Sequence, residues 1–184
     1  MTKANGRTNN HHTCIHLVRH VETEENLAKI LQGHMPGTLT AKGISQAQAL
    51  RSIIDINSFD VIISSDLKRV TDTVSIYLNG RKKEWETTPL LREIDWASMT
   101  GMKIADVDIN RLAPDIETKE MLYERAGKAL KYILEKYHGK TLLLVSHGLF
   151  LRSLIAQITN VPINQLHTIR KMENCEVRTF TINQ

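Results

Sequence analysis

The chain has 184 residues, of which 41% are hydrophobic and 24% are charged, as in an ordinary globular domain. No apolar run approaches the ~20 residues of a membrane-spanning helix, and the amino terminus lacks the apolar core of a signal peptide. We therefore expect a cytoplasmic protein with no membrane partner. The net charge of +4 favours anionic partners, but no basic run is long enough for a nucleic-acid footprint, so no nucleic-acid partner is expected.

The first half of the chain alternates predicted strands and helices. Residues 14–18 form a short apolar run that is typical of a buried strand. Residues 40–54 carry apolar side chains at helical spacing, with Thr40 as the expected N-cap. A β-branched run at 59–63 predicts a second strand, and the apolar residues between 67 and 78 return to a helical period.

The second half continues this alternation. Residues 121–137 present one apolar stripe, which predicts a helix with Gly139 as its C-cap. Residues 141–145 read as a strand buried on both faces, and a nearly all-apolar helix follows as far as Ile158. Residues 176–182 alternate and predict a last strand near an edge. We therefore predict an α/β fold, three-layer αβα with a mostly parallel central sheet.

This fold is expected to occupy residues 13–184 as one domain, after a disordered polar tail over residues 1–12. Cys14 and Cys175 fall in strand-like segments, and we expect buried free thiols there, not a disulfide. The adjacent His11 and His12 lack the usual spacing of metal ligands, so no metal site is expected. The oligomeric state stays open.

Cationic and imidazole side chains follow the carboxyl ends of three predicted strands. Arg19 and His20 follow the first strand, Arg69 lies one helical turn beyond the second, and His147 follows the third. If these strands are parallel neighbours, the four side chains meet at one edge of the sheet, where α/β proteins bind ligands. Helix amino termini at this edge favour an anion. The arrangement predicts a pocket for a phosphoryl group.

Six short motifs stand in order along the chain: RHVETEEN at 19–26, LQG at 31–33, TLTAKG at 38–43, SSDLKR at 64–69, LREID at 91–95 and VSHG at 145–148. Each is weak alone. In this order and at these spacings, they resemble the motifs of the histidine phosphatase superfamily, the phosphoglycerate-mutase-like proteins, in its branch of small phosphatases. The resemblance spans most of the chain and implies the fold of that superfamily, without a cofactor or metal.

The resemblance also implies a two-step transfer through phosphohistidine. His20 would attack phosphorus, Glu93 would protonate the leaving oxygen, and Arg19, Arg69 and His147 would hold the phosphoryl oxygens. Fixed cations suit this task because they stabilise the charge that develops in the transition state. A second group of residues is expected to bind the phosphate or the substrate: Thr23, Asn26, Gln32 and Gly33.

Simpler interpretations stand beside these roles. Arg19 and His20 could be a surface cation and a structural histidine, Asn26 an ordinary helix-surface residue, and Glu93 a solvated partner of Arg92. His147 could merely cap the following helix. Val21 stands where the superfamily usually has glycine, which places a β-branched side chain next to the predicted nucleophile.

The preferred function is hydrolysis of a phosphate monoester of a small phosphorylated substrate. A mutase must shield its phosphohistidine from water, and only 53 residues separate Glu93 from His147, with 37 after His147, so little chain remains for a cover. Two further alternatives are a protein-phosphohistidine phosphatase and a non-catalytic phosphate-binding regulatory module. The sequence does not choose among sugar phosphates, nucleotides, phosphoglycerates and ribazole phosphate.

Overall fold

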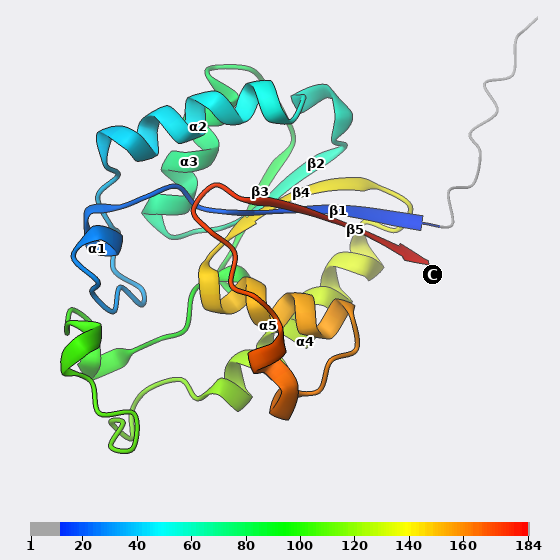
Figure 1. The fold of residues 1–184 in the computed structure, drawn as a ribbon. Coiled ribbons are helices and arrows are strands. Elements are labelled where there is room, and N and C mark those ends of the chain that lie inside the picture. Colours follow the sequence, from blue (N-terminus) through cyan, green and yellow to red (C-terminus); the bar gives the residue numbers. More distant parts are fainter. Residues whose placement is uncertain (1–11, 184) are drawn as a thin grey trace, which may run out of the picture.

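The computed structural model describes residues 12–183 and has a five-stranded sheet at its centre (Figure 1). The strand order is β3-β2-β4-β1-β5; β5 is antiparallel to β1, and the other neighbours are parallel. The predicted mostly parallel sheet is therefore confirmed. The strands are β1 (His12–Arg19), β2 (Val61–Ser65), β3 (Trp85–Thr88), β4 (Thr141–Ser146) and β5 (Val177–Asn183).

Helices cover both faces of the sheet, which confirms the three-layer arrangement. Helices α2 and α3 lie on one face, and α4 and α5 lie on the other. The short α1 lies near the carboxyl end of β1 (Figure 1). The α-helices are α1 (Glu24–Leu27), α2 (Ala41–Ile53), α3 (Lys68–Leu78), α4 (Lys119–Lys136) and α5 (Gly148–Ile158). Short 3-10 segments join them, η1 (Ile56–Ser58), η2 (Pro89–Leu91), η3 (Ala97–Met99), η4 (Ile104–Asp106) and η5 (Ile163–Thr168).

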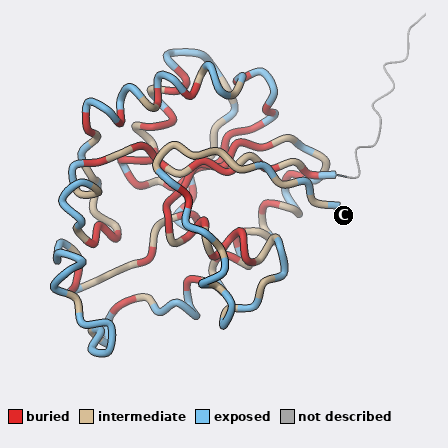
Figure 2. The backbone as a smooth tube through the Cα atoms, viewed as in Figure 1, coloured by how far each residue is buried: buried red, intermediate tan, exposed pale blue. Residues whose placement is uncertain are grey.

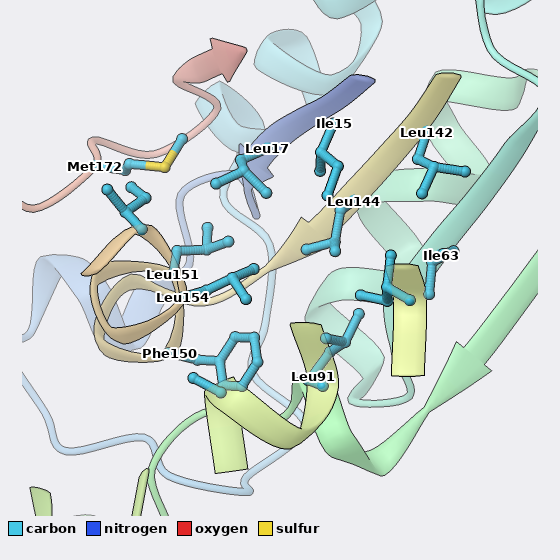
Figure 3. Packing of buried hydrophobic residues seen from close by; sticks show 14 of the residues in the cluster. Ile15, Leu17, Ile63, Leu91, Leu142, Leu144, Phe150, Leu151, Leu154 and Met172 are labelled. Carbon is cyan, nitrogen blue, oxygen red and sulfur yellow. The ribbon is translucent and has the colours of Figure 1, made fainter. Parts of the chain in front are cut away.

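The alternation of side chains along each strand builds two hydrophobic clusters, one on each face of the sheet. Leu142 and Leu144 of β4 point toward α4 and α5, where they pack with Phe150 and other residues (Figure 3). Leu143 and Val145 belong to the cluster on the opposite face, beneath α2 and α3. Burial therefore runs through the sheet and the inner sides of the helices (Figure 2). This two-sided packing fixes the strand ends that carry the site.

Local signals placed most helix ends correctly. Thr40 caps α2 as predicted, because its hydroxyl accepts a hydrogen bond from the backbone N–H of Gly43. The predicted end of α4 is corrected: the helix ends at Lys136 with Tyr137 as its C-cap, and Gly139 lies in the following turn with φ of 69°. Its backbone N–H donates to the Thr13 hydroxyl, which ties this turn to β1.

Two further expectations differ from the structure. Strand β3 was not predicted, because its four residues form a short edge strand with no clear alternation. Cys14 and Cys175 are free thiols but are only half-buried, so the expectation of buried thiols is wrong. Cys175 lies in the turn before β5 with φ of 62°, not in a strand.

Of the predicted tail at residues 1–12, only His12 lies within the described residues, where it begins β1. Among residues 12–183, no helix is both long and apolar enough to cross a membrane.

A small lobe flanks the sheet edge where β1, β2 and β4 end, and it contains η3 and η4 (Figure 1). Leu31, Met99 and Ile116 form its own hydrophobic cluster. An antiparallel bridge between Ile30 and Lys103 attaches it to the chain that follows α1.

Candidate active site

The carboxyl ends of β1, β2 and β4 lie side by side, as the sequence predicted. The register pairs Arg19 of β1 with Ser146 of β4, and Ser64 of β2 with Val145 of β4, so the three ends are level. His20 and His147 follow directly, and their ring centroids are 5.3 Å apart. His20 and His147, which are far apart in the sequence, therefore meet at the carboxyl ends of the parallel strands.

His20 is held as a neutral imidazole with a defined tautomer. The ring is 2% exposed, and its Nδ1 lies 2.7 Å from the carbonyl oxygen of Val21. Because a carbonyl oxygen only accepts, Nδ1 carries the proton and Nε2 carries the lone pair. Burial lowers the pKa of His20 well below its ordinary value, and the positive charges of Arg69 and Arg19 lower it further. Nε2 is therefore available as a nucleophile at neutral pH.

The departure at Val21 leaves this geometry intact. The contact with His20 uses the backbone carbonyl, which any residue supplies. The backbone N–H of Val21 donates to the Thr73 hydroxyl on α3, 3.3 Å away, and the valine side chain is fully buried. The β-branched side chain thus fills space beside the strand without disturbing the histidine.

Backbone carbonyls hold the two arginines in place. Arg19 donates from Nη1 to the carbonyl of Met172 at 2.8 Å. Arg69 donates to the carbonyls of Met35 and Gly33, at 2.5 and 2.9 Å. Within the described residues, the buried Nε of each guanidinium has no hydrogen-bond partner. Each arginine therefore keeps one buried donor for an anion that enters the site.

Both arginines remain cationic at neutral pH. Burial lowers the pKa of Arg69 to about 10, although the nearby Glu93 acts in the opposite direction. Burial also lowers the pKa of Arg19, and Glu93 again opposes the shift. The Arg19 guanidinium lies against the first residue of α5, Gly148, where an added Cβ would come within 3.3 Å of Nε. Glycine there lets the cation approach the amino terminus of the helix.

His147 precedes α5 but does not cap it with its side chain. Its Nε2 lies 2.8 Å from the hydroxyl oxygen of Ser65, and within the described residues its buried Nδ1 has no partner. Burial lowers the pKa of His147 well below its ordinary value, and Arg69 is the largest charge acting in the same direction. His147 is therefore the N-cap residue of α5 by position, but its side chain makes no capping hydrogen bond.

Glu93 caps α5 instead. Its Oε1 accepts backbone N–H bonds from Ile94 and Phe150, both at 3.0 Å, and its Oε2 accepts one from Leu149 at 3.1 Å. The first N–H groups of a helix have no partner within the helix, so this carboxylate satisfies two of them. Glu93 is thereby fixed at the helix end that also follows His147.

Glu93 does not pair with Arg92, contrary to the simpler interpretation of this residue. Arg92 instead forms a two-pronged ion pair with Asp66, with N···O distances of 2.7 and 2.6 Å. Arg125 donates to the backbone carbonyl of Glu93 at 3.2 Å and so supports the loop, not the carboxylate. The Glu93 side chain is therefore directed to α5 and the site.

Asn26 is oriented by two donors. Its Oδ1 accepts from the backbone N–H of Thr23 and from Nδ2 of Asn174, both at 3.2 Å. The amide –NH₂ of Asn26 therefore points away from these groups and is left as a donor. Asn174 also donates to the carbonyl of His20 at 2.9 Å, which ties Asn26 to the nucleophile's strand end.

The remaining predicted binding residues support this frame. The Thr23 hydroxyl donates to Oε1 of Gln32 at 3.1 Å and caps α1, and Gly33 holds Arg69 through its carbonyl. Direct contact of Thr23, Gln32 and Gly33 with phosphate stays a prediction. No cluster of three or more potential metal ligands occurs among residues 12–183, and His11 of the predicted histidine pair lies outside them.

Sequence reasoning missed two contributors to this site. Ser65 was noted only within the motif SSDLKR, although a polar side chain at the end of a wholly buried strand is itself a signal. Asn174 had no signal in the sequence, because its contacts with Asn26 and His20 span about 150 residues.

Comparison with known proteins assigns the chain to a family. The model of the histidine phosphatase superfamily, branch 1, matches residues 15–184. The chain belongs to this superfamily. The resemblance to this superfamily that the sequence motifs indicated is therefore confirmed.

Some similar proteins are named phosphatases and others phosphoglycerate mutases. An adenosylcobalamin/alpha-ribazole phosphatase of Escherichia coli is 28% identical over 173 residues, which cover 86% of this chain and 85% of that protein. A probable phosphoglycerate mutase of Proteus mirabilis is 31% identical over 177 residues, covering 89% and 82%. The structure of a phosphoserine phosphatase of Entamoeba histolytica in complex with 3-phosphoglyceric acid has a TM-score of 0.80 and 25% identity, covering 91% and 90%. The predicted fold and the class of phosphoric monoester hydrolase are confirmed for this histidine phosphatase.

Proposed function

We propose that this histidine phosphatase hydrolyses a small phosphate monoester through a phosphorylated His20. The observation that carries the proposal is the fixed tautomer of His20, whose Nδ1–H is engaged by the Val21 carbonyl. Its Nε2 lone pair forms the new N–P bond while the bond between phosphorus and the ester oxygen breaks. Glu93, when protonated, gives its proton to that departing oxygen and leaves it as an alcohol.

Two cationic side chains and one neutral imidazole stabilise the transferring phosphoryl group. The donors are the unpartnered Nε atoms of Arg19 and Arg69, together with the ring of His147. The amino terminus of α5 also favours a bound anion at this place. A positioned donor of this kind is typically worth ~10²–10³-fold in rate. The –NH₂ of Asn26 supplies a further donor to a phosphoryl oxygen.

In the second step, water attacks the phosphohistidine and returns His20 to its neutral form. The Glu93 carboxylate, which lost its proton in the first step, takes one from this water. Water adds to phosphorus, the N–P bond breaks, and inorganic phosphate leaves. The cycle consumes one water per ester and needs no other reactant.

Hydrolysis is favoured over transfer to a second hydroxyl. Between Glu93 and His147, the chain forms α4 and β4, which belong to the central fold and do not cover the site. The remaining segment, residues 97–117, is largely exposed. A mutase needs its phosphohistidine covered. Presented with 3-phosphoglycerate, the enzyme should release phosphate faster than it forms 2-phosphoglycerate; efficient interconversion with little free phosphate would favour the mutase.

Substrate choice is tested by phosphate release from a panel. The named relatives and the complex above point to ribazole phosphate, phosphoserine and phosphoglycerate, and a phosphohistidine peptide represents the protein-phosphatase alternative. Each rate is compared with that of His20→Ala, which removes the nucleophile. We expect small esters to be hydrolysed faster than the peptide. Equal rates for the wild type and His20→Ala on every substrate would refute the proposed function.

A further inference from the structure

The Ser65 hydroxyl contacts Nε2 of His147, whereas Nδ1 of the same ring has no hydrogen-bond partner among the described residues. Ser65 is the last residue of β2 and is 0% exposed. Its Oγ accepts a hydrogen bond from the backbone N–H of Leu67 at 3.2 Å and lies 2.8 Å from Nε2 of His147. The hydroxyl therefore has one proton and one lone pair still to place.

The proton of this hydroxyl has a single acceptor among the hydrogen bonds of the described residues, and that acceptor is Nε2 of His147. If the ring donated instead, the serine proton would be buried without a partner, which is unfavourable. The balance of hydrogen bonds favours the arrangement in which Ser65 donates and the ring accepts.

A ring that accepts at Nε2 is neutral and carries its proton on Nδ1. Burial of the ring and the positive charges of Arg69 and Arg125 make a second proton on His147 unfavourable. Nδ1 is buried and has no hydrogen-bond partner among the described residues. It can donate to a phosphoryl oxygen only in this tautomer, because the other tautomer presents a lone pair to an anion.

We propose that Ser65 is a positioning residue that fixes His147 in the Nδ1–H tautomer and so makes it a hydrogen-bond donor to the phosphoryl group. The part that concerns the phosphoryl group rests on the proposed function. The tautomer itself does not, because it is set in the protein without substrate. The two parts can therefore fail separately.

Ser64 offers a matched control. It is the preceding residue of β2, is equally buried, and carries the same hydroxyl. Its Oγ donates to the carbonyl of Ser65 and accepts from the indole N–H of Trp85, at 3.0 and 2.9 Å. The two serines thus differ in whether the hydroxyl contacts the His147 ring.

The first test reads the tautomer by NMR of the full-length protein labelled with ¹⁵N in its histidines. Two-bond proton–nitrogen correlations distinguish a protonated from an unprotonated ring nitrogen, and the His147 signals are assigned by their loss in His147→Gln. We expect Nδ1 protonated and Nε2 unprotonated in the wild type and in Ser64→Ala. In Ser65→Ala, the signals should shift toward a mixture of tautomers. A protonated Nε2 in the wild type would overturn the proposal, whether or not the variants fold.

The second test measures inhibition by orthovanadate, an oxyanion that mimics the phosphoryl group. Ser65→Ala should weaken inhibition about tenfold, as expected for the loss of one hydrogen bond to an anion. Ser64→Ala should weaken it less than twofold. An equal loss in both variants would assign Ser65 a purely structural role. A wild type with the predicted tautomer but no phosphatase activity would instead refute the proposed function and leave the tautomer assignment standing.

Discussion

His20 donates from Nδ1 to the carbonyl oxygen of Val21, its own neighbour in the chain, across 2.7 Å. The bond that orients the nucleophile is therefore made by the backbone, and the identity of residue 21 is free to vary where the superfamily usually has glycine. What the valine adds is a fully buried side chain beside the strand end. This separation of roles can be tested directly.

Val21→Gly should lower stability more than catalysis. Loss of the buried side chain leaves a cavity, and glycine adds conformational entropy to the unfolded chain, so the free energy of unfolding should fall by about 2–4 kcal/mol. The kcat/KM for p-nitrophenyl phosphate should stay within about threefold, because the carbonyl that orients His20 remains. Urea unfolding and steady-state kinetics below the transition measure both. A stable variant with little activity would show that the side chain itself shapes the site.

His20 should become covalently phosphorylated during turnover. With a radioactive phosphate ester and rapid acid-free quenching, label that is labile to acid should appear on the wild type and be absent from His20→Ala. His16→Ala is the matched control, because His16 lies on β1 just before His20 but its ring contacts the Thr179 hydroxyl of β5. Label that persists in His20→Ala, or that disappears in His16→Ala, would contradict the assignment.

Activity should survive dialysis against a strong chelator. The guanidinium groups of Arg19 and Arg69 carry the positive charge that balances the phosphoryl group, so no divalent ion is needed for this purpose. Phosphate release before and after dialysis is the measurement, and orthovanadate should inhibit both samples equally. Activity that disappears and returns with added Mg²⁺ or Zn²⁺ would show that the mechanism lacks an essential component.

The sequence alone predicted those parts of the site that depend on local pattern. The apolar runs predicted at 14–18, 59–63 and 141–145 were enough to place the cations at the carboxyl ends of the strands, because parallel neighbouring strands end together. The motif at 91–95 located Glu93 but not its contacts. That carboxylate caps a helix that begins more than 50 residues later, and no periodicity in a single segment encodes such a pairing.

The segment before β5 shows the same limit. Asn174 and the Met172 carbonyl hold His20 and Arg19, although they stand about 150 residues away in the sequence. The segment is itself fixed by Glu176, which forms ion pairs with Arg170 and Arg178. Contacts of this kind depend on the antiparallel register of β5 on β1, which only the folded sheet supplies.

Glu176 should link stability to pH. Burial alone would raise the pKa of this carboxyl, but hydrogen bonds from Arg170 and Arg178 outweigh it and bring the pKa to about 2. A folded-state pKa below the unfolded value of 4.5 means that the stabilisation is present above pH 4.5 and is lost as pH falls toward 2. Glu176→Gln should therefore destabilise the protein at pH 7 and lose this effect near pH 2.5. Urea unfolding at both pH values measures it.

Glu173→Gln removes an equal charge three residues away and is the control for Glu176→Gln. It should change stability less at pH 7, because its side chain is exposed. If the difference between wild type and Glu176→Gln stayed constant from pH 7 to pH 2.5, the ion pairs would not be the source of the stabilisation.

Glu93→Gln should slow the enzyme according to the leaving group. A general acid helps when the departing oxygen would otherwise leave as a high-energy alkoxide, and it is typically worth ~10²–10⁴-fold. An alkyl phosphate such as phosphoserine should therefore be hydrolysed at least about 100-fold more slowly. The p-nitrophenolate ion leaves easily without a proton, so its ester should lose less than about tenfold.

Two measurements separate acid catalysis from the structural role of Glu93 as the cap of α5. Inhibition by inorganic phosphate should change little, because Arg19, Arg69 and His147 keep their positions through other contacts. Asp95→Asn serves as the control carboxylate, since Asp95 accepts from the Ala97 N–H and not from α5. It should slow both esters equally or not at all. If Glu93→Gln slowed both esters by the same factor and also weakened phosphate inhibition, Glu93 would only hold the helix in place. The general acid would then be Asp95 if Asp95→Asn slowed the alkyl ester more than the aryl ester.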